Sequence, residues 1–243
     1  MQEDSETFRI SLRAGFWAGI LMLVLFLTLF METVSNQSLA NLGNYPKTWL
    51  GIVGIFVSPL IHSNFNHLLG NLLPVCGGFF LVGLLYPDIA LRVLSIIWIA
   101  TGILVWFTGR PAYHIGSSGV GYGLISFLFF IGLLRKDRSA MVISLLVLLT
   151  QSTMIIGWLP LDYKVSYESH AAGIVVGTFT ALIYFNRYPR QNINISTDLV
   201  DFPEEVVPIY PKVVVTPKEL GTSYSVQNED NELMVKHKTE DLA

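Results

Sequence analysis

The sequence is poor in charge and almost without cysteine. Only 14% of its 243 residues are Asp, Glu, Lys or Arg, whereas a soluble domain carries roughly a quarter. The chain therefore lacks the charged surface that a water-soluble protein presents. Its single cysteine, Cys76, excludes an internal disulfide and any cysteine-based metal cluster. The formal net charge of -3 gives no excess of basic residues, so we expect no nucleic-acid partner.

Long apolar runs take the place of charge. Hydrophobic residues make up 52% of the chain, and its mean hydropathy is +0.53. A membrane-spanning helix needs about 20 mainly apolar residues, and six segments reach or approach that length. They predict an all-α protein embedded in the lipid bilayer, with six spans at Ala14–Met31, Asn66–Leu85, Ile89–Phe107, Ser117–Leu134, Ser139–Leu159 and Ser169–Phe185.

The six spans divide the chain into three parts. Residues 1–13 precede the first span, residues 14–186 form the membrane domain, and residues 187–243 form a polar tail that holds most of the acidic residues. The tail is rich in proline and charge, so we expect it to be largely disordered, with one short strand at Val213–Thr216. The half-apolar connection Glu32–Phe65 is too long for a tight turn and predicts a loop at the membrane interface.

Basic residues predict the orientation of the spans, because the loops that stay in the cytoplasm carry an excess of Lys and Arg. The short loop between spans four and five holds Arg135, Lys136 and Arg138, whereas the loops on the other side hold one basic residue each. Arginines also precede span one and follow span six. Both termini are therefore expected in the cytoplasm, and spans two, four and six run from outside to inside.

Histidine and serine gather at the outer ends of these three spans. His62, His67, His114 and His170 lie at or near these ends, and Ser118 opens span four. Ionisable groups are costly inside a bilayer, so each is a functional candidate. The topology alone brings His67, Ser118 and His170 to a similar depth. A serine hydroxyl beside a neutral imidazole is typical of nucleophilic catalysis, in which the imidazole removes the proton from the hydroxyl.

The residues around these groups favour a site of that kind. Ser118 stands in the run Gly116-Ser117-Ser118-Gly119, where glycine permits unusual backbone and leaves the serine open to substrate. The start of a helix also presents unpaired N–H groups that stabilise an oxyanion. Asn71 lies one helical turn after His67, and Tyr122 lies one turn after Ser118, so each pair shares a helix face.

Two pairs of glycines predict close contact between spans four and six. Gly119 and Gly123 are four residues apart in span four, and Gly173 and Gly177 are four apart in span six. Such small-residue pairs let the backbones of two membrane helices approach each other. The glycines of span six share a face with His170, so this contact brings the imidazole within reach of span four.

In these residues the chain resembles the rhomboid family of intramembrane serine proteases. The resemblance runs from Ser58 to Phe185 and rests on His62-x4-His67-x3-Asn71, on Gly116-Ser117-Ser118-Gly119 with Tyr122, and on His170-x2-Gly173-x3-Gly177. It implies that Ser118 is the nucleophile and His170 the general base. It further implies that His67, Asn71 and the Ser118 N–H hold the oxyanion, and that Tyr122 packs against the His170 ring.

The resemblance also implies a substrate, a location and the absence of a cofactor. The substrate is another membrane protein, cut near the outer end of a transmembrane segment. The basic six-span form points to the plasma membrane of a prokaryote. The chain departs from the family at one place: the first long loop commonly carries a Trp-Arg pair, and Trp49–Ser58 contains no arginine. This departure puts the anchoring of that loop in doubt and leaves the dyad unaffected.

Two alternatives remain open. A rhomboid-like protein without activity would bind unstable membrane helices, although the presence of Ser118 and His170 argues against it. A small transporter or metal-handling channel could use the four histidines His62, His67, His114 and His170. Metal sites of that kind usually include a carboxylate, and we place Asp162 and Glu168 in a loop rather than in a span.

Overall fold

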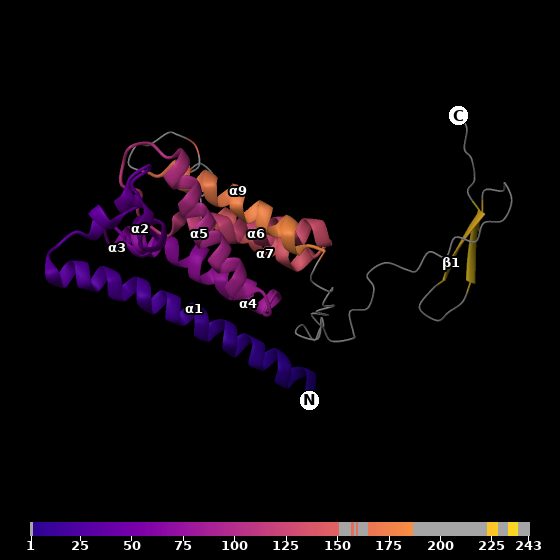
Figure 1. The fold of residues 1–243 in the computed structure, drawn as a ribbon. Helices are drawn as coiled ribbons and strands as arrows, with labels where there is room; N and C mark the ends of the chain where they lie inside the picture. Colours follow the sequence, from indigo (N-terminus) through magenta and orange to yellow (C-terminus); the bar gives the residue numbers. More distant parts are fainter. Residues whose placement is uncertain are drawn as a thin grey trace. The chain divides into compact units, whose positions relative to one another are not determined.

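The computed structural model describes residues 2–150, 157, 159, 165–186, 223–227 and 233–237. The chain divides into two compact units, Met1–Arg190 and Gln191–Ala243. In the first unit the described elements are all helical (Figure 1). They are α1 (Gln2–Ser35), η1 (Leu39–Leu42), α2 (Trp49–Val57), η2 (Ser58–Leu60), α3 (Phe65–Leu72), η3 (Leu73–Gly77), α4 (Gly78–Leu85), α5 (Ala90–Thr108), α6 (Ser118–Arg135), α7 (Arg138–Thr150) and α9 (Tyr167–Tyr184).

Four of the described helices are long and apolar enough to cross a membrane, at Ser5–Ser35, Phe65–Leu85, Ala90–Thr108 and Ser118–Arg135. They coincide with the first four predicted spans, although α1 begins earlier and includes most of residues 1–13. The sixth predicted span corresponds to α9. Its first turn contains Glu168 and His170, so it is less apolar than these four helices. The fifth, Ser139–Leu159, begins as α7, and beyond Thr150 only Gly157 and Leu159 belong to the described residues.

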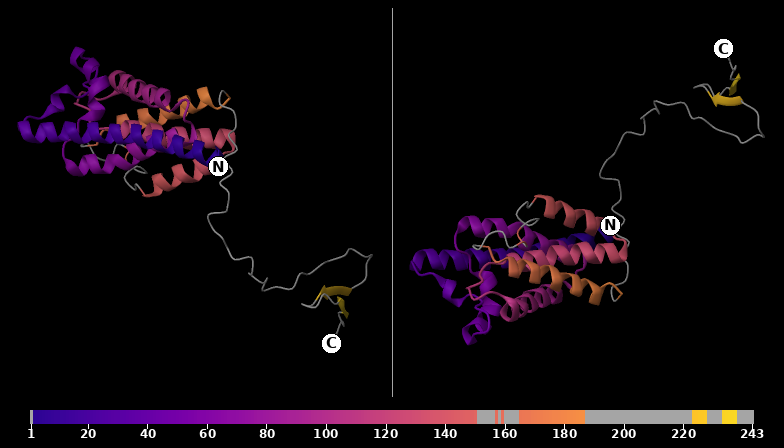
Figure 2. Two further views of the ribbon diagram at one scale, coloured as in Figure 1. Left: turned by 90° about the horizontal axis from the view of Figure 1, so that it is seen from below. Right: turned by 90° about the horizontal axis from the view of Figure 1, so that it is seen from above.

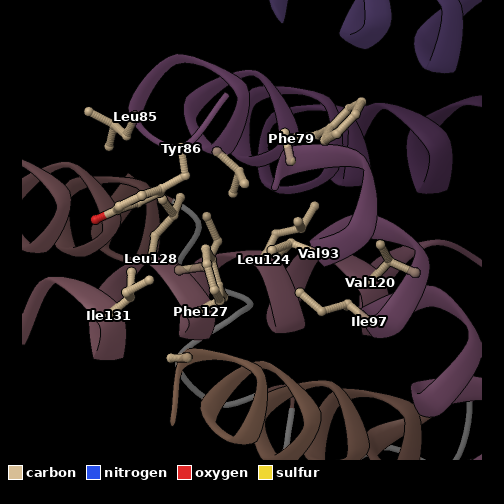
Figure 3. Packing of buried hydrophobic residues seen from close by; sticks show 14 of the residues in the cluster. Phe79, Leu85, Tyr86, Val93, Ile97, Val120, Leu124, Phe127, Leu128 and Ile131 are labelled. Atoms are coloured by element: carbon tan, nitrogen blue, oxygen red, sulfur yellow. The ribbon is translucent and has the colours of Figure 1, made fainter. Parts of the chain in front are cut away.

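Helix α6 lies at the centre of the bundle. It packs against α9, α7 and α5, while α1 lies on the far side along α4 (Figure 2). Its buried side chains interlock with those of α5 and of the turn after α4, as Figure 3 shows. Phe127 is fully buried and meets the ring of Tyr86 edge to face, with 5.9 Å between the ring centroids. Burial of apolar surface between helices thus fixes the position of α6, which carries Ser118 as its first residue.

The contact between α6 and α9 is a contact of backbones. A Cβ atom added to Gly173 would collide with the carbonyl of Gly119, and one added to Gly177 would collide with the carbonyl of Gly123. Any larger residue at these positions would force the two helices apart. The close approach predicted from the two glycine pairs is therefore confirmed.

The second span is interrupted in its middle by a wide turn. Between α3 and α4 the chain forms the π-helical segment η3, which contains Pro74 at its start. Proline has no N–H, and its ring clashes with the carbonyl of the residue four places earlier, so it displaces the regular helical hydrogen bonds. The Pro74 ring packs directly on Gly121, where an added Cβ atom would come within 3.0 Å. The wide turn lies between the part of the span that carries His67 and Asn71 and the part that forms α4.

The long connection after α1 is ordered and partly helical. Its helix α2 exposes Trp49, Leu50, Val53 and Phe56, while Ile55 is buried against Gly102 of α5. The indole Nε1–H of Trp98 donates to the carbonyl of Phe56 at 3.0 Å. One face of α2 is therefore anchored on α5, and its other face is apolar and exposed, as expected of a loop at a membrane interface.

The described residues of the second unit form a pair of antiparallel strands, β1 (Ser223–Gln227) and β2 (Leu233–His237). Ser223 pairs with His237 and Gln227 with Leu233. These two strands were not predicted from the sequence. The strand expected at Val213–Thr216 lies outside the described residues.

Candidate active site

Ser118 and His170 form a hydrogen bond across the contact between α6 and α9. Ser118 is the first residue of α6, and His170 lies in the first turn of α9. Their atoms Oγ and Nε2 are 2.7 Å apart. Ser118 is half-buried, whereas the side chain of His170 is buried. The hydroxyl thus lies within proton-transfer distance of an imidazole in a protected position, the arrangement that activates a serine.

A backbone carbonyl fixes the tautomer of His170. The Nδ1 atom lies 2.6 Å from the carbonyl oxygen of Gly157. A carbonyl only accepts, so Nδ1 carries the proton, and Nε2 turns its lone pair toward Ser118. This contact was not predicted from the sequence, because a backbone carbonyl can belong to any residue and leaves no side-chain signal.

Tyr122 holds the imidazole from one face. Its ring stacks on that of His170 with 4.3 Å between the centroids and 19° between the planes. Tyr122 lies one turn after Ser118, so a single face of α6 provides both the hydroxyl and the surface beneath the imidazole. Stacking, together with the hydrogen bond to Gly157, leaves the His170 ring little freedom to rotate.

His67 lies against the chain just before the serines. The imidazole covers the Cα atom of Gly116, where an added Cβ atom would be 2.8 Å from Nε2. Gly116 has φ of +101°, in the region that favours glycine, so both its conformation and its surroundings require this residue. The N–H of Ser63 donates to His67 Nδ1 at 3.4 Å. In the neutral imidazole the proton is therefore on Nε2, on the side of Gly116.

Asn71 reaches the same place from the next turn of α3. It is buried, and its Nδ2 atom donates to the carbonyl of His67 at 3.0 Å. The same atom is 3.8 Å from the position that a Cβ of Gly116 would take. An amide nitrogen has two hydrogens, and the bond to His67 uses one. His67 and Asn71 thus present N–H donors beside the backbone that leads into Ser118.

A second histidine–serine pair distinguishes the two adjacent serines. Ser117 is fully buried, and its Oγ atom lies 3.1 Å from Nε2 of His62, which is 1% exposed. Burial, helped by the nearby His67, lowers the pKa of His62 to about 4, which keeps it neutral near pH 7. Ser117 is therefore shielded from the surroundings, whereas Ser118 is half-buried.

A third pair ties the loop before α6 to the start of α9. His114 Nδ1 lies 2.6 Å from the hydroxyl of Ser166, the residue that caps α9. Burial lowers the pKa of His114, and Nε2, 3.1 Å from the carbonyl of Arg110, is the protonated nitrogen. The Ser166 hydroxyl then donates to Nδ1 and accepts from the N–H of Ser169. The helix that carries His170 is thus held in place by the loop that precedes Ser118.

An ion pair strengthens the same connection. The guanidinium of Arg110 lies 3.1 Å from the carboxylate of Glu168, and it also donates to the carbonyl of Val165 at 3.0 Å. Glu168 was placed in a loop from the sequence, but it lies in the first turn of α9. A carboxylate there interacts favourably with the positive end of the helix dipole. Neither residue was predicted to take part in the site.

In the described part of the chain, no three His, Cys, Asp or Glu side chains come close enough to hold a metal ion. The histidines proposed as metal ligands instead each contact a serine hydroxyl: His67 meets Ser63 at 3.2 Å, and the other three meet Ser117, Ser118 and Ser166. This geometry does not favour the metal-handling alternative.

Comparisons with known proteins agree with the geometry. Residues 49–187 match the family model of the Rhomboid domain. The uncharacterized protein Mb1372 of Mycobacterium bovis is 30% identical over 169 residues, which cover 66% of this chain and 70% of that protein. The uncharacterized protein ML1171 of Mycobacterium leprae is 28% identical over 171 residues, covering 67% of this chain and 68% of that protein.

Proposed function

Because the chain belongs to the rhomboid family, we propose that it is an intramembrane serine endopeptidase with Ser118 as nucleophile and His170 as general base. The observation that carries this proposal is the 2.7 Å hydrogen bond between these two side chains at the start of α6 and α9. The Gly157 carbonyl and the Tyr122 ring, which fix the tautomer and the plane of the imidazole, support the same assignment.

In the first half of the reaction, Ser118 Oγ attacks the carbonyl carbon of the scissile peptide bond. His170 Nε2 takes the proton of the hydroxyl, and the imidazolium that forms keeps its Nδ1–H bond to Gly157. The negative charge then develops on the former carbonyl oxygen. The Nε2–H of His67, an amide hydrogen of Asn71 and the N–H of Ser118 are the donors for this oxygen. His170 gives its proton to the leaving amine, and an acyl ester on Ser118 remains.

The second half of the reaction restores the enzyme. A water molecule attacks the ester carbonyl while His170 Nε2 takes one of its protons, and the same donors hold the oxyanion. Collapse of this intermediate breaks the bond to Ser118 Oγ, which regains its proton from His170. In serine proteases with a triad, a carboxylate orients the histidine. Here the carbonyl of Gly157 does so, and it needs no charge inside the bilayer, where a charge is costly.

The proposal includes a topology and a substrate. Six spans would cross the plasma membrane of a prokaryote, with both termini in the cytoplasm and the dyad toward the outer face. The substrate would be a membrane protein, because the half-buried serine lies at the outer end of a helix that is otherwise apolar. A peptide bond in a substrate helix is shielded until that helix unwinds, so cleavage is expected near the outer end of a locally unstable transmembrane segment.

Covalent labelling tests the proposal. A fluorophosphonate reacts with an activated serine, and we expect the purified full-length protein to carry the adduct on Ser118. Ser118→Ala should abolish both labelling and cleavage of a model transmembrane substrate, whereas Ser117→Ala should still be labelled. An adduct on Ser117 would overturn the assignment of the nucleophile. A folded wild-type protein that neither labels nor cleaves would favour the alternative of a silent protein that binds membrane helices.

A further inference from the structure

His62 takes no part in the reaction described above, yet it contacts both halves of the site. Its Nδ1 atom lies 3.2 Å from the carbonyl oxygen of Leu60. The carbonyl only accepts, so Nδ1 carries the proton and Nε2 is the acceptor. Nε2 accepts a hydrogen bond from the N–H of Ser117 at 3.4 Å, and it lies 3.1 Å from the Ser117 hydroxyl. Every polar atom of the His62 ring is therefore used, and two of its contacts go to the residue next to Ser118.

The contact with His62 diverts Ser117 from its ordinary role at a helix start. Ser117 is the N-cap residue of α6, and a serine there normally accepts a hydrogen bond from the N–H of the second or third helical residue. No such bond forms in α6. The hydroxyl turns to His62 instead, so the cap side chain does not cover the N–H groups of the first turn. Ser118 follows as the first residue of the helix, and the proposed mechanism uses its N–H as an oxyanion donor.

The other edge of the His62 ring meets His67. The two rings lie 5.0 Å apart at their centroids, at an angle of 63°. His67 in turn lies on Gly116, the residue before Ser117. One buried ring thus touches the backbone that presents the nucleophile and supports an imidazole that donates to the oxyanion.

We propose that His62 is a positioning residue, which through Ser117 and His67 sets the geometry of the nucleophile and of the oxyanion donors. This inference rests on the proposed function and adds a residue to it. A displacement of about 1 Å in such a site can cost a hundredfold in rate. His62→Leu keeps an apolar filling of the space but removes the acceptor for Ser117. We expect it to lower kcat about a hundredfold and to leave KM within about threefold, because substrate binding does not use His62.

Two further variants separate positioning from folding. His62→Gln keeps a side-chain acceptor of similar reach and should recover kcat to within about tenfold of wild type. Ser117→Ala removes the hydroxyl but keeps the N–H, and should lower kcat by about tenfold. Ser144→Ala is the matched control: this buried hydroxyl of α7 donates to the carbonyl of Met141 at 2.9 Å, far in sequence from the site. It should leave kcat unchanged.

The experiment measures kcat and KM for a transmembrane substrate, with concentrations set by active-site titration, and thermal unfolding of each full-length variant in detergent. Reduced kcat in Ser117→Ala at a stability equal to that of Ser144→Ala supports positioning. Wild-type kcat in folded Ser117→Ala and His62→Leu variants overturns it, and so does a Gln variant whose kcat is no higher than that of the Leu variant. If wild type and Ser118→Ala are equally inactive, the proposed function itself has failed.

Discussion

The Nδ1 atom of His170 lies 2.6 Å from the carbonyl oxygen of Gly157, while Nε2 of the same ring lies 2.7 Å from the hydroxyl of Ser118. The imidazole is thus held at both nitrogens by neutral groups. In the proposed mechanism a serine and a histidine suffice, because the protein backbone orients the base. The same arrangement predicts that His170 and the oxyanion donors contribute very different amounts to catalysis.

Replacing the base should cost far more activity than replacing an oxyanion donor. Loss of one such donor typically lowers turnover about a hundred- to a thousandfold. Asn71→Ala should therefore slow cleavage of a transmembrane substrate by about that factor and leave measurable activity. His170→Ala should leave almost none, because the proposed mechanism transfers the proton of Ser118 to Nε2 of His170. Equal and complete loss in two folded variants would show that Asn71 has a structural role instead.

The backbone contact between α6 and α9 predicts an asymmetry among glycines. Gly173→Ala would drive a methyl group into the carbonyl of Gly119, separate the helices and move His170 away from Ser118. We expect a lower melting temperature and a strong loss of activity. Gly70→Ala is the control, because no atom lies within 4 Å of an added Cβ in α3. There alanine should be neutral or stabilising by up to about 1 kcal/mol. Equal effects in both variants would contradict the predicted steric mechanism.

The ion pair between Arg110 and Glu168 should contribute to activity by holding the start of α9. Glu168→Gln removes the charge but keeps the shape. The pair is partly exposed, with 24% and 10% of the two side chains accessible, so the change in stability should be small, about 1 kcal/mol or less. The larger effect should be a lower kcat, because α9 carries His170. The exposed Glu6 of α1 provides the control, Glu6→Gln, which should change neither quantity.

Burial of His62 predicts a pH dependence of stability. Its pKa is lowered from 6.5 to about 4 in the folded protein, mainly by burial and further by His67. The unfolded chain therefore binds a proton near pH 6.5 that the folded protein binds only near pH 4. The resulting contribution to the free energy of unfolding is fully present above pH 6.5. It is lost as the pH falls toward 4, by about 3 kcal/mol at most. Thermal unfolding between pH 7.5 and 4.5 measures it.

His62→Gln should flatten part of this slope, because glutamine does not titrate. The remaining slope should include His114, whose pKa burial also lowers. If wild type and His62→Gln lost stability in parallel as the pH fell, the buried imidazole of His62 would not be the source of the pH dependence.

The proposed topology can be checked with reporter fusions. Arg135, Lys136 and Arg138 follow α6 in one short segment, and such clusters remain in the cytoplasm. Fusions after Arg138 and after Arg190 should both read as cytoplasmic, and one at Asp162 as external. The reverse pattern would place the dyad toward the cytoplasm, although the hydrogen bond between Ser118 and His170 would be the same.

Much of the site could be predicted because its residues are coupled through helix geometry. Ser118 with Tyr122, and His67 with Asn71, are each spaced by one turn, and hydropathy places the helices that carry them. Helical spacing and small residues also predicted the contact of Gly119 with Gly173. These are local rules that a single sequence displays.

The remaining features depend on contacts that sequence spacing does not encode. The carbonyl of Gly157 is a backbone atom, and Arg110 meets Glu168 only because two separate segments fold together. The π-helical turn had a visible signal in Pro74, in the middle of an apolar run, but its packing against Gly121 is a contact between two separate segments. His62 was a functional candidate from the sequence, but its contact with Ser117 is seen only in the folded chain.

The glycine contacts between α6 and α9 have a mechanical consequence. Where the glycine backbones meet, no side chain lies between them to change rotamer, so we expect the two helices to move together and the distance between Ser118 and His170 to change little when other helices shift. In the proposed protease, admission of a substrate would then depend on other elements. If the chain is the proposed protease, lipids that loosen those elements should alter how often it meets its substrate, while the rate of the chemical step stays the same.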